Sequence, residues 1–151
     1  MRLYLVRHGD AVAAEVDAER PLSPRGMDQA RRTAALLCEI GAAPVAIEHS
    51  PKARARQTAE IVAAALGKRA ALAVNDGINP DDDPTPVAQA IARRSGDLIL
   101  VGHLPFLPRL AQQLLGAGAP SGIASLGPAG VLILDHDGQA WRFVQRLTLD
   151  H

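Results

Sequence analysis

Apolar and polar positions alternate along the chain in two different patterns. Short apolar runs predict strands, and longer segments in which apolar residues recur every three or four positions predict helices. Strands are expected around residues 3–6, 44–49, 71–74, 97–101, 130–135 and 141–149. Helices are expected between these runs, over residues 24–40, 51–66, 85–94 and 105–116.

The two longer helices carry residues that commonly mark helix ends. In the first, Ser23 is placed to cap the amino end, Pro24 fits the first turn and Gly41 fits the stop. The second repeats this pattern, with Ser50 at its start and Gly67 at its end. The spacing predicts that the buried face of the first helix consists of Met27, Ala30, Ala34, Leu37 and Cys38.

This order of elements predicts an α/β fold. Strands that alternate with helices imply a mostly parallel sheet with helices on both faces, which is a three-layer α/β/α sandwich. The last two apolar runs flank the turn sequence DHDGQ and predict a C-terminal antiparallel hairpin. Alternation within the final strand predicts one shared apolar face for Trp141, Phe143, Leu147 and Leu149.

Length and charge narrow the possible classes of protein. A chain of 151 residues suffices for one domain, which we expect to span residues 1–151. Its formal net charge is zero, which argues against a nucleic-acid or membrane-surface binder. The single cysteine, Cys38, cannot form an internal disulfide, and no signal-peptide pattern precedes the first strand. We therefore expect a cytoplasmic protein, and we take it to be a monomer.

Polar residues stand at the ends of two strands that should be buried. Arg7, His8 and Gly9 directly follow the first apolar run, and His103 follows the run at 97–101. In parallel sheets, ligands bind beyond the carboxyl ends of the strands. Arg54 lies near the start of a helix that opens toward the same edge. The sequence therefore predicts that these side chains converge on one pocket.

Such a set of residues suits an anionic ligand. A guanidinium group can donate two parallel hydrogen bonds to two phosphate oxygens, and the amino end of a helix offers unpaired N–H groups. The sequence contains no glycine-rich loop of the nucleotide-binding types, so no nucleotide cofactor is expected. A neutral histidine beside these arginines can attack phosphorus and form a phosphohistidine, which water then hydrolyses. That attack requires the second ring nitrogen to donate to a fixed acceptor.

A metal site is the alternative interpretation of the histidines. His8, His49 and His103 could in principle ligate one ion, but the neighbouring arginines would repel a cation. No closely spaced ligand pair such as HxH or HExxH is present. We therefore expect no metal and no cofactor.

Four segments, in the order VRHGDA, ERPLSPRG, SPKARARQTA and LVGHLP, resemble the histidine phosphatase superfamily, which is marked by its RHG motif. The short length, the RPL segment and the form of the third motif resemble its SixA-type phosphohistidine phosphatase branch. The resemblance covers nearly the whole chain. It implies that His8 is the nucleophile, that Arg7, Arg54 and Arg20 bind the phosphoryl oxygens, and that His103 completes the catalytic pocket.

The expected activity is hydrolysis of phosphohistidine on a partner protein, such as a component of a phosphorelay or phosphotransferase chain. A broad phosphomonoesterase acting on small phosphate esters is the second hypothesis, and a phosphate-binding regulatory module without turnover is the third. Retention of His8 favours an enzyme over such a module.

The family's carboxylic acid, which protonates the leaving oxygen in many relatives, has no certain counterpart in this chain. The nearby candidates are Asp76, Asp81, Asp82 and Asp83. For each of them a role in an ordinary polar turn is the favoured interpretation. Lack of an acid would favour phosphohistidine over alkyl esters, because a protonated imidazole can leave as a neutral ring.

Overall fold

The computed structural model describes residues 1–67 and 69–149, so Lys68 and the last two residues of the expected domain lie outside the described residues. Six strands form one sheet in the order β3-β2-β4-β1-β5-β6. They are β1 (Arg2–Arg7), β2 (Ala46–His49), β3 (Ala71–Val74), β4 (Leu98–Gly102), β5 (Val131–His136) and β6 (Trp141–Leu147). The first four are parallel, whereas β5 and β6 are antiparallel to their neighbours. The predicted fold class is confirmed.

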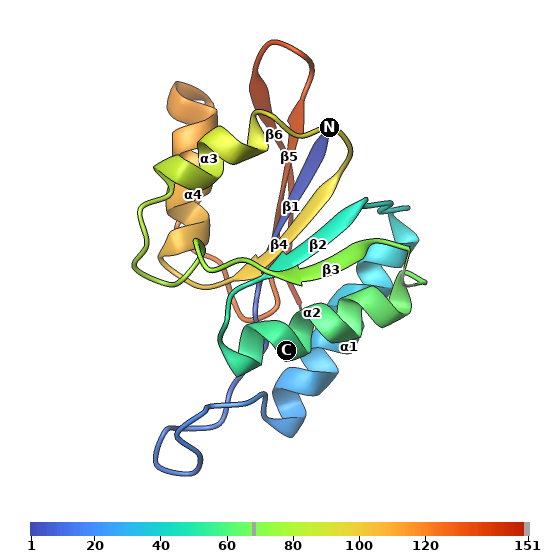
Figure 1. Cartoon of the computed structure of the whole chain (residues 1–151), viewed down its shortest axis with the longest axis vertical. Coiled ribbons are helices and arrows are strands. Elements are labelled where there is room, and N and C mark those ends of the chain that lie inside the picture. The colour runs from blue at the N-terminus through green and yellow to red at the C-terminus, as the bar shows by residue number, and fades with distance from the viewer. Residues whose placement is uncertain (68, 150–151) are drawn as a thin grey trace.

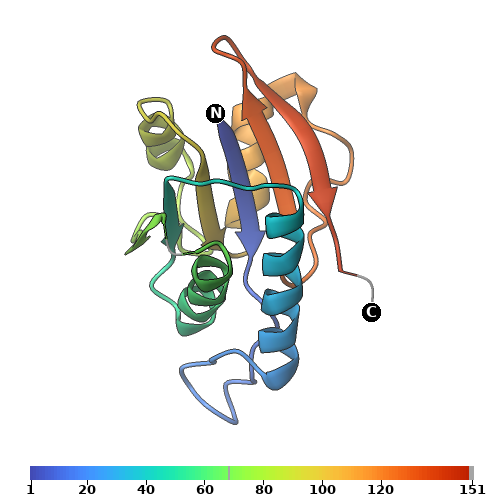
Figure 2. The same ribbon diagram turned by 90° about the vertical axis from the view of Figure 1, so that its right-hand side faces the viewer.

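Helices cover both faces of this sheet (Figures 1 and 2). They are α1 (Pro24–Glu39), α2 (Ala53–Ala65), α3 (Thr85–Ile91) and α4 (Phe106–Leu115), followed by the short 3-10 helix η1 (Gly116–Gly118). The pair α1 and α2 packs on one face, and the pair α3 and α4 packs on the other.

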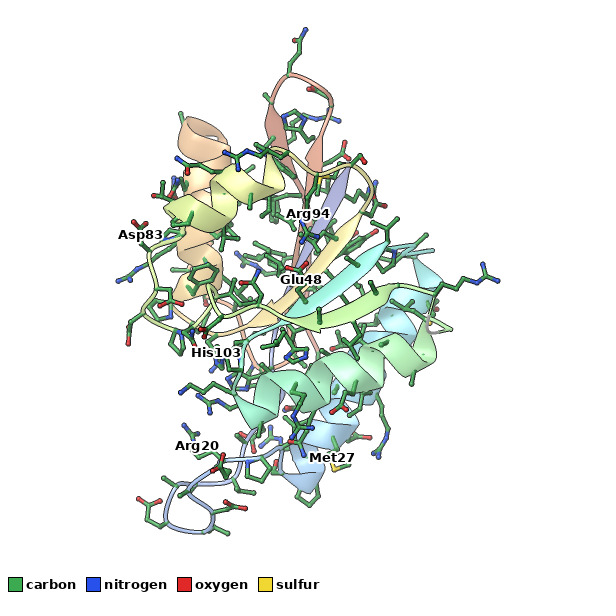
Figure 3. All side chains as sticks on the ribbon, in the orientation of Figure 1. Arg20, Met27, Glu48, Asp83, Arg94 and His103 are labelled. Atoms are coloured by element: carbon green, nitrogen blue, oxygen red, sulfur yellow. The ribbon has the colours of Figure 1, made fainter. Side chains whose placement is uncertain are left out.

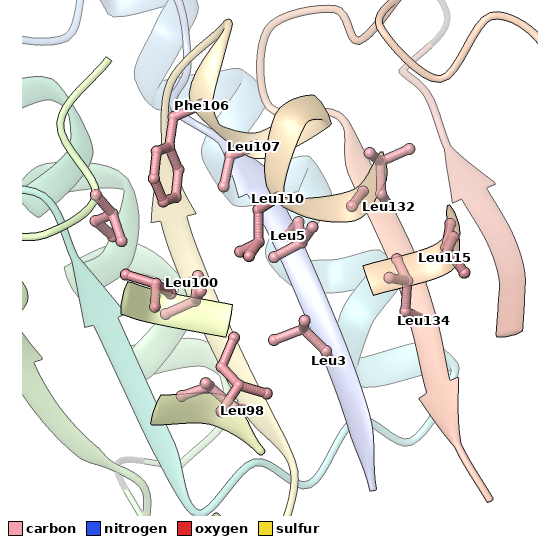
Figure 4. Packing of buried hydrophobic residues seen from close by; sticks show 14 of the residues in the cluster. Leu3, Leu5, Leu98, Leu100, Phe106, Leu107, Leu110, Leu115, Leu132 and Leu134 are labelled. Carbon is pink, nitrogen blue, oxygen red and sulfur yellow. The ribbon is translucent and has the colours of Figure 1, made fainter. Parts of the chain in front are cut away.

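Alternate residues of the central strands form the two cores. Leu3 and Leu5 of β1 point toward α3 and α4, whereas Tyr4 and Val6 point toward α1 and α2. Figure 4 shows the first of these clusters, in which leucines of the sheet pack against Phe106 and its neighbours in α4. The continuous apolar runs of β1 and β4 are explained by this burial on both faces.

The predicted ends of α1 are confirmed. The Ser23 hydroxyl accepts a hydrogen bond from the Gly26 N–H at 3.0 Å, and Gly41, which follows the C-terminal cap residue Ile40, adopts a φ of 75°. For α2 only the end is confirmed, since Gly67 has a φ of 84°. Its predicted start is wrong, because Lys52 is the residue that precedes the helix and the Ser50 hydroxyl is used elsewhere.

The expected buried face of α1 is partly wrong. Ala30, Ala34 and Leu37 are buried, but Met27 is 37% exposed and Cys38 lies on the surface. The positions that face inward instead are Gly26, Gln29 and Thr33. Gln29 and Thr33 are buried because they bond to backbone: Gln29 accepts from Asp10 N–H at 2.8 Å, and Thr33 donates to the Ala129 carbonyl at 2.7 Å. A pattern of apolar residues cannot locate such positions.

The expected single apolar face of the last strand is also wrong. Trp141 and Phe143 pack with the core under α3 and α4, whereas Leu147 packs with the core under α1 and α2. The register explains this, because Leu134 pairs with Phe143 while its neighbour Ile133 pairs with Gln145. The extra residue, Val144, forms a bulge that exchanges the two faces of β6.

The third predicted helix ends early. It was expected to reach residue 94, but α3 stops at Ile91. Arg94 forms an ion pair with Glu48 of β2 instead, and Asn75 donates a second hydrogen bond to the same carboxylate at 2.9 Å. This long-range pairing ties the segment before β4 and the segment after β3 to the sheet.

Candidate active site

His8 and His103 lie together at the carboxyl ends of two central strands of the sheet. The strands β1 and β4 are parallel neighbours, with Arg7 paired to Gly102, and each histidine follows directly after its strand. Their ring centroids are 5.0 Å apart. The His8 N–H also donates to the Gly102 carbonyl at 3.0 Å, so the backbone fixes the two histidine positions relative to each other. The structure therefore brings them together as the sequence predicts.

The hydrogen bond of the His8 ring defines which nitrogen is free. Nδ1 lies 2.6 Å from the Gly9 carbonyl oxygen, which can only accept, so Nδ1 carries the hydrogen. In the neutral ring Nε2 then holds an unshared electron pair. Burial, the largest cause, and the charges of Arg54, Arg7 and Arg20 together lower the pKa of His8 to about 4, although the Gly9 hydrogen bond opposes them. The ring is thus neutral at physiological pH.

Arg7 is hydrogen-bonded to residues that lie far from it in the sequence, between η1 and β5. Its Nη1 donates to the Leu126 carbonyl at 2.8 Å, and its backbone N–H donates to the Gly130 carbonyl at 2.9 Å. Its buried Nε has no hydrogen-bond partner within the described residues. Burial lowers the pKa of Arg7, and the carboxylate of Asp10 opposes that effect. One side of the guanidinium is therefore anchored, and donors remain for a ligand.

Arg54 and Arg20 add positive charge from two other elements. Arg54 lies in the first turn of α2, and burial together with the charge of Arg20 lowers its pKa. Arg20 lies in the loop before α1, where its Nε donates to the Val12 carbonyl at 3.1 Å and its φ is 47°. Figure 3 shows Arg20 on the same side of the molecule as His103. The residues thus surround His8 with cations from separate parts of the chain.

Ser50 is a site residue that the sequence analysis missed. Its side chain is fully buried, and its hydroxyl oxygen lies 2.5 Å from Nε2 of His103. Burial and, to a smaller extent, the charges of His8, Arg54, Lys52 and Arg7 together lower the pKa of His103 to about 3. A serine before proline at a helix start signals a cap in sequence, so only the fold could show this pairing.

Two glycines make the approach of the His8 loop to α1 possible. A Cβ atom on Gly9 would lie 2.5 Å from the Gly26 carbonyl oxygen, and one on Gly26 would lie 1.9 Å from the Asp10 carbonyl oxygen. The Gly9 N–H donates to the Thr58 hydroxyl at 3.1 Å, which links the same loop to α2. Neither position can hold a side chain without movement of the backbone.

The candidate acidic residues have local bonds. Asp82 accepts from the Asn79 N–H at 2.9 Å, and Asp83 accepts from the Thr85 N–H at 2.9 Å at the start of α3. Asp76 contacts the Asn79 side-chain amide, and Asp81 is exposed. Within the part of the chain that the structure describes, the charges that shift the pKa of His8 and His103 do not include a carboxylate. These contacts fit turn and cap roles.

Residues 1–67 and 69–149 contain no group of three or more His, Cys, Asp or Glu side chains that could hold a metal ion. His49 is buried, with Nδ1 2.8 Å from the Ser50 carbonyl. Within the same ranges, none of the helices is long and apolar enough to span a membrane.

Comparison with known proteins identifies the family. The sequence model of the histidine phosphatase superfamily (branch 1) matches residues 3–79. The chain belongs to this superfamily. An uncharacterized protein of Picosynechococcus sp. is 35% identical over 122 residues, which cover 76% of this chain and 73% of that protein.

Solved structures of SixA-type phosphohistidine phosphatases share the fold of this chain. The protein histidine phosphatase SixA in complex with tungstate has a TM-score of 0.85 at 24% identity, with 98% of this chain and 97% of that chain covered. A protein assigned as the phosphohistidine phosphatase SixA of Agrobacterium tumefaciens has a TM-score of 0.82 at 28% identity, with 99% and 98% covered. A phosphoserine phosphatase of Entamoeba histolytica shares the fold, with a TM-score of 0.73 at 18% identity and 98% and 97% covered.

Proposed function

We propose that this histidine phosphatase hydrolyses phosphohistidine on a partner protein, without a metal ion, through a phosphorylated His8. The observation that carries the proposal is the state of the His8 ring. Its Nδ1 is bonded to the Gly9 carbonyl, its pKa is lowered to about 4, and three arginine charges act on it. A neutral, oriented imidazole amid cations is suited to attack a phosphoryl group and unsuited to binding a metal.

In the first step, Nε2 of His8 attacks phosphorus while the P–N bond to the substrate imidazole breaks. The electron pair of that bond leaves with the substrate ring. In the second step, water attacks the phosphorus, the bond to His8 breaks and inorganic phosphate is released. Arg7, Arg54 and Arg20 bind the equatorial oxygens, and His103 donates to one of them as charge develops.

The local bonds of the candidate acids Asp76, Asp82 and Asp83 support a phosphoramidate substrate. An alkyl ester needs a proton on its leaving oxygen, and a general acid contributes about 10²–10⁴-fold in rate. An imidazole that is already protonated at its second nitrogen leaves as a neutral ring. The turn and cap contacts of Asp82 and Asp83 leave these carboxylates engaged in local structure. The relatives described as phosphohistidine phosphatases point in the same direction.

The test compares release of phosphate from a phosphohistidine-carrying protein domain and from an aryl phosphate, in the presence of a chelator. We expect faster release from the protein, and no release from either substrate with His8→Ala. Comparable or faster turnover of the aryl ester would favour the small-molecule phosphatase. No turnover of either substrate would favour a binding module.

A matched pair of arginines on α2 tests the proposed phosphate contacts. Arg54→Ala should lower kcat/KM by about 10²-fold or more, because it removes a charge that acts on the transferring group. Arg56→Ala removes an exposed arginine two positions along, which forms an ion pair with Glu60 at 2.9 Å, and should leave kcat/KM within about twofold.

A further inference from the structure

A mostly apolar groove lies beside the proposed active site. It has a volume of about 580 Å³ and runs between the first two turns of α4 and the segment that follows η1. Pro108 and Ile123 are its buried members, and Arg109 stands exposed on its rim. The residues that line the groove are Leu104, Pro105, Pro108, Arg109, Gln112, Gln113, Ile123 and Ala124.

Both walls of the groove adjoin residues of the candidate active site along the chain. On one wall, Leu104 directly follows His103. On the other wall, Ala124 precedes by two residues Leu126, whose carbonyl accepts the hydrogen bond from Arg7. A molecule whose phosphoryl group reaches His8 and His103 therefore has the groove directly beside it.

The dimensions and chemistry of the groove fit a helix better than a small metabolite. From Pro105 to Gln112 it follows about two helical turns, or roughly 10 Å. Its interior is apolar, whereas the residues proposed to bind phosphate are all cationic or imidazole groups. A small polar ester bound at His8 would leave this apolar surface uncovered. An amphipathic helix can place a phosphorylated histidine at His8 and apolar residues three to seven positions away in the groove.

Positive charge around the groove and around the candidate active site indicates which residues the partner should carry. Arg109 borders the groove, and Lys52, which is exposed, lies close enough to His103 for its charge to lower that ring's pKa. Acidic residues on the partner would complement these cations and speed association.

We propose that the groove lined by Leu104 to Gln113 and by Ile123 and Ala124 docks the apolar face of a helix on which the partner protein carries its phosphohistidine, with acidic residues beside it. This inference rests on the proposed function and adds a substrate-recognition surface outside the reacting groups.

The experiment fills the groove without touching the reacting groups. Ala124 is an exposed residue of the groove. Ala124→Trp places a large side chain there, and Ala124→Gln places one of intermediate size. The matched control is Ala140→Trp, at an exposed position in the β5–β6 turn. That turn lies at the opposite end of the sheet, where His136 bonds to Met1. For each variant kcat/KM is measured with a phosphohistidine-carrying helical protein domain and with free phosphohistidine.

We expect Ala124→Trp to lower kcat/KM for the phosphoprotein by about tenfold or more, mainly through KM, and to change that for free phosphohistidine less than twofold. Ala124→Gln should give a smaller loss, and Ala140→Trp none. Equal losses on both substrates, or no loss on the phosphoprotein while the wild type hydrolyses it, would overturn the groove assignment alone. If the wild type released phosphate from small esters but not from the phosphoprotein, the proposed function would be overturned, and the groove assignment with it.

Discussion

The hydroxyl oxygen of Ser50 lies 2.5 Å from Nε2 of His103, and both side chains are buried. The same hydroxyl accepts a longer bond from the Lys52 N–H at 3.4 Å, and it can donate its own hydrogen to the imidazole when Nε2 is the acceptor. A neutral imidazole that accepts at Nε2 carries its hydrogen on Nδ1. Nδ1 of His103 is buried and has no partner within the described residues. We therefore expect Ser50 to orient His103 so that Nδ1 can donate to a phosphoryl oxygen.

Ser50→Ala should lower kcat about tenfold while KM changes little. The substitution leaves Nε2 of His103 without its partner, which costs about 1–3 kcal/mol for a buried polar group, and releases the ring from one tautomer. Steady-state kinetics and a pH profile of kcat check this. Ser50→Thr keeps the hydroxyl and should recover part of the rate. An unchanged kcat in Ser50→Ala would show that the serine serves stability alone.

His8 should stay neutral well below the ordinary range of histidine. Burial, and then the charges of Arg54, Arg7 and Arg20, lower its pKa to about 4. NMR titration of the labelled imidazole should show a neutral ring at pH 5.5, with the hydrogen on Nδ1. Arg20→Gln removes one of the cations and should raise the His8 pKa. A midpoint near 6.5 in the folded wild type would contradict the described environment.

The same pKa shift predicts how stability depends on pH. The folded state binds fewer protons than the unfolded state between the lowered pKa of His8 and about 6.5, so the free energy of unfolding falls as pH falls through this window. Above about pH 6.5 His8 makes no such contribution. Denaturant unfolding at pH 7.0, 5.5 and 4.5 measures the slope, and His8→Gln should reduce it. An equal slope in the variant would assign the acid sensitivity to other groups.

Gly26→Ala should destabilise the protein, although alanine normally favours a helix over glycine by up to about 1 kcal/mol. The new methyl group would stand 1.9 Å from the Asp10 carbonyl oxygen, so the His8 loop or α1 must move. Thermal unfolding should show a lower Tm, and activity should fall with it. Gly118→Ala is the matched control, since no atom lies within 4 Å of its added Cβ. A Tm equal to or above that of the wild type in Gly26→Ala would contradict the close packing.

Tetrahedral oxyanions should stabilise the folded protein. A ligand present at 100 times its Kd adds about 2.7 kcal/mol to the free energy of unfolding. For a chain of this size that corresponds to a rise in Tm of about 5–10 °C. Differential scanning fluorimetry with added tungstate or inorganic phosphate measures the change in Tm. Arg54→Ala should remove the shift and Arg56→Ala should keep it, so equal shifts in both variants would place the anion elsewhere.

The fold and the convergence of the site could be predicted because they depend on patterns local to each element. The apolar runs specified the central strands, and polar residues at the ends of two such strands indicated the edge at which His8 and His103 meet. Polar side chains that bond across the fold could not be predicted in this way. Gln29 and Thr33 are buried through bonds to distant backbone, and the role of Ser50 depends on a residue 53 positions away. Likewise, a single bulge at Val144 exchanged the faces of β6.

The hydrogen bond from Arg7 to the Leu126 carbonyl joins residues 119 positions apart. Arg54 and His103 belong to segments of the chain that lie between Arg7 and Leu126. No short fragment of the chain therefore contains all the residues proposed to bind phosphate. Contacts of such long sequence separation form late, because the entropy lost in closing a long loop precedes any gain from the contact. During refolding, helical signal should therefore recover before phosphatase activity. Phosphate binding at this site is therefore expected only after the chain has folded from β1 to at least Leu126.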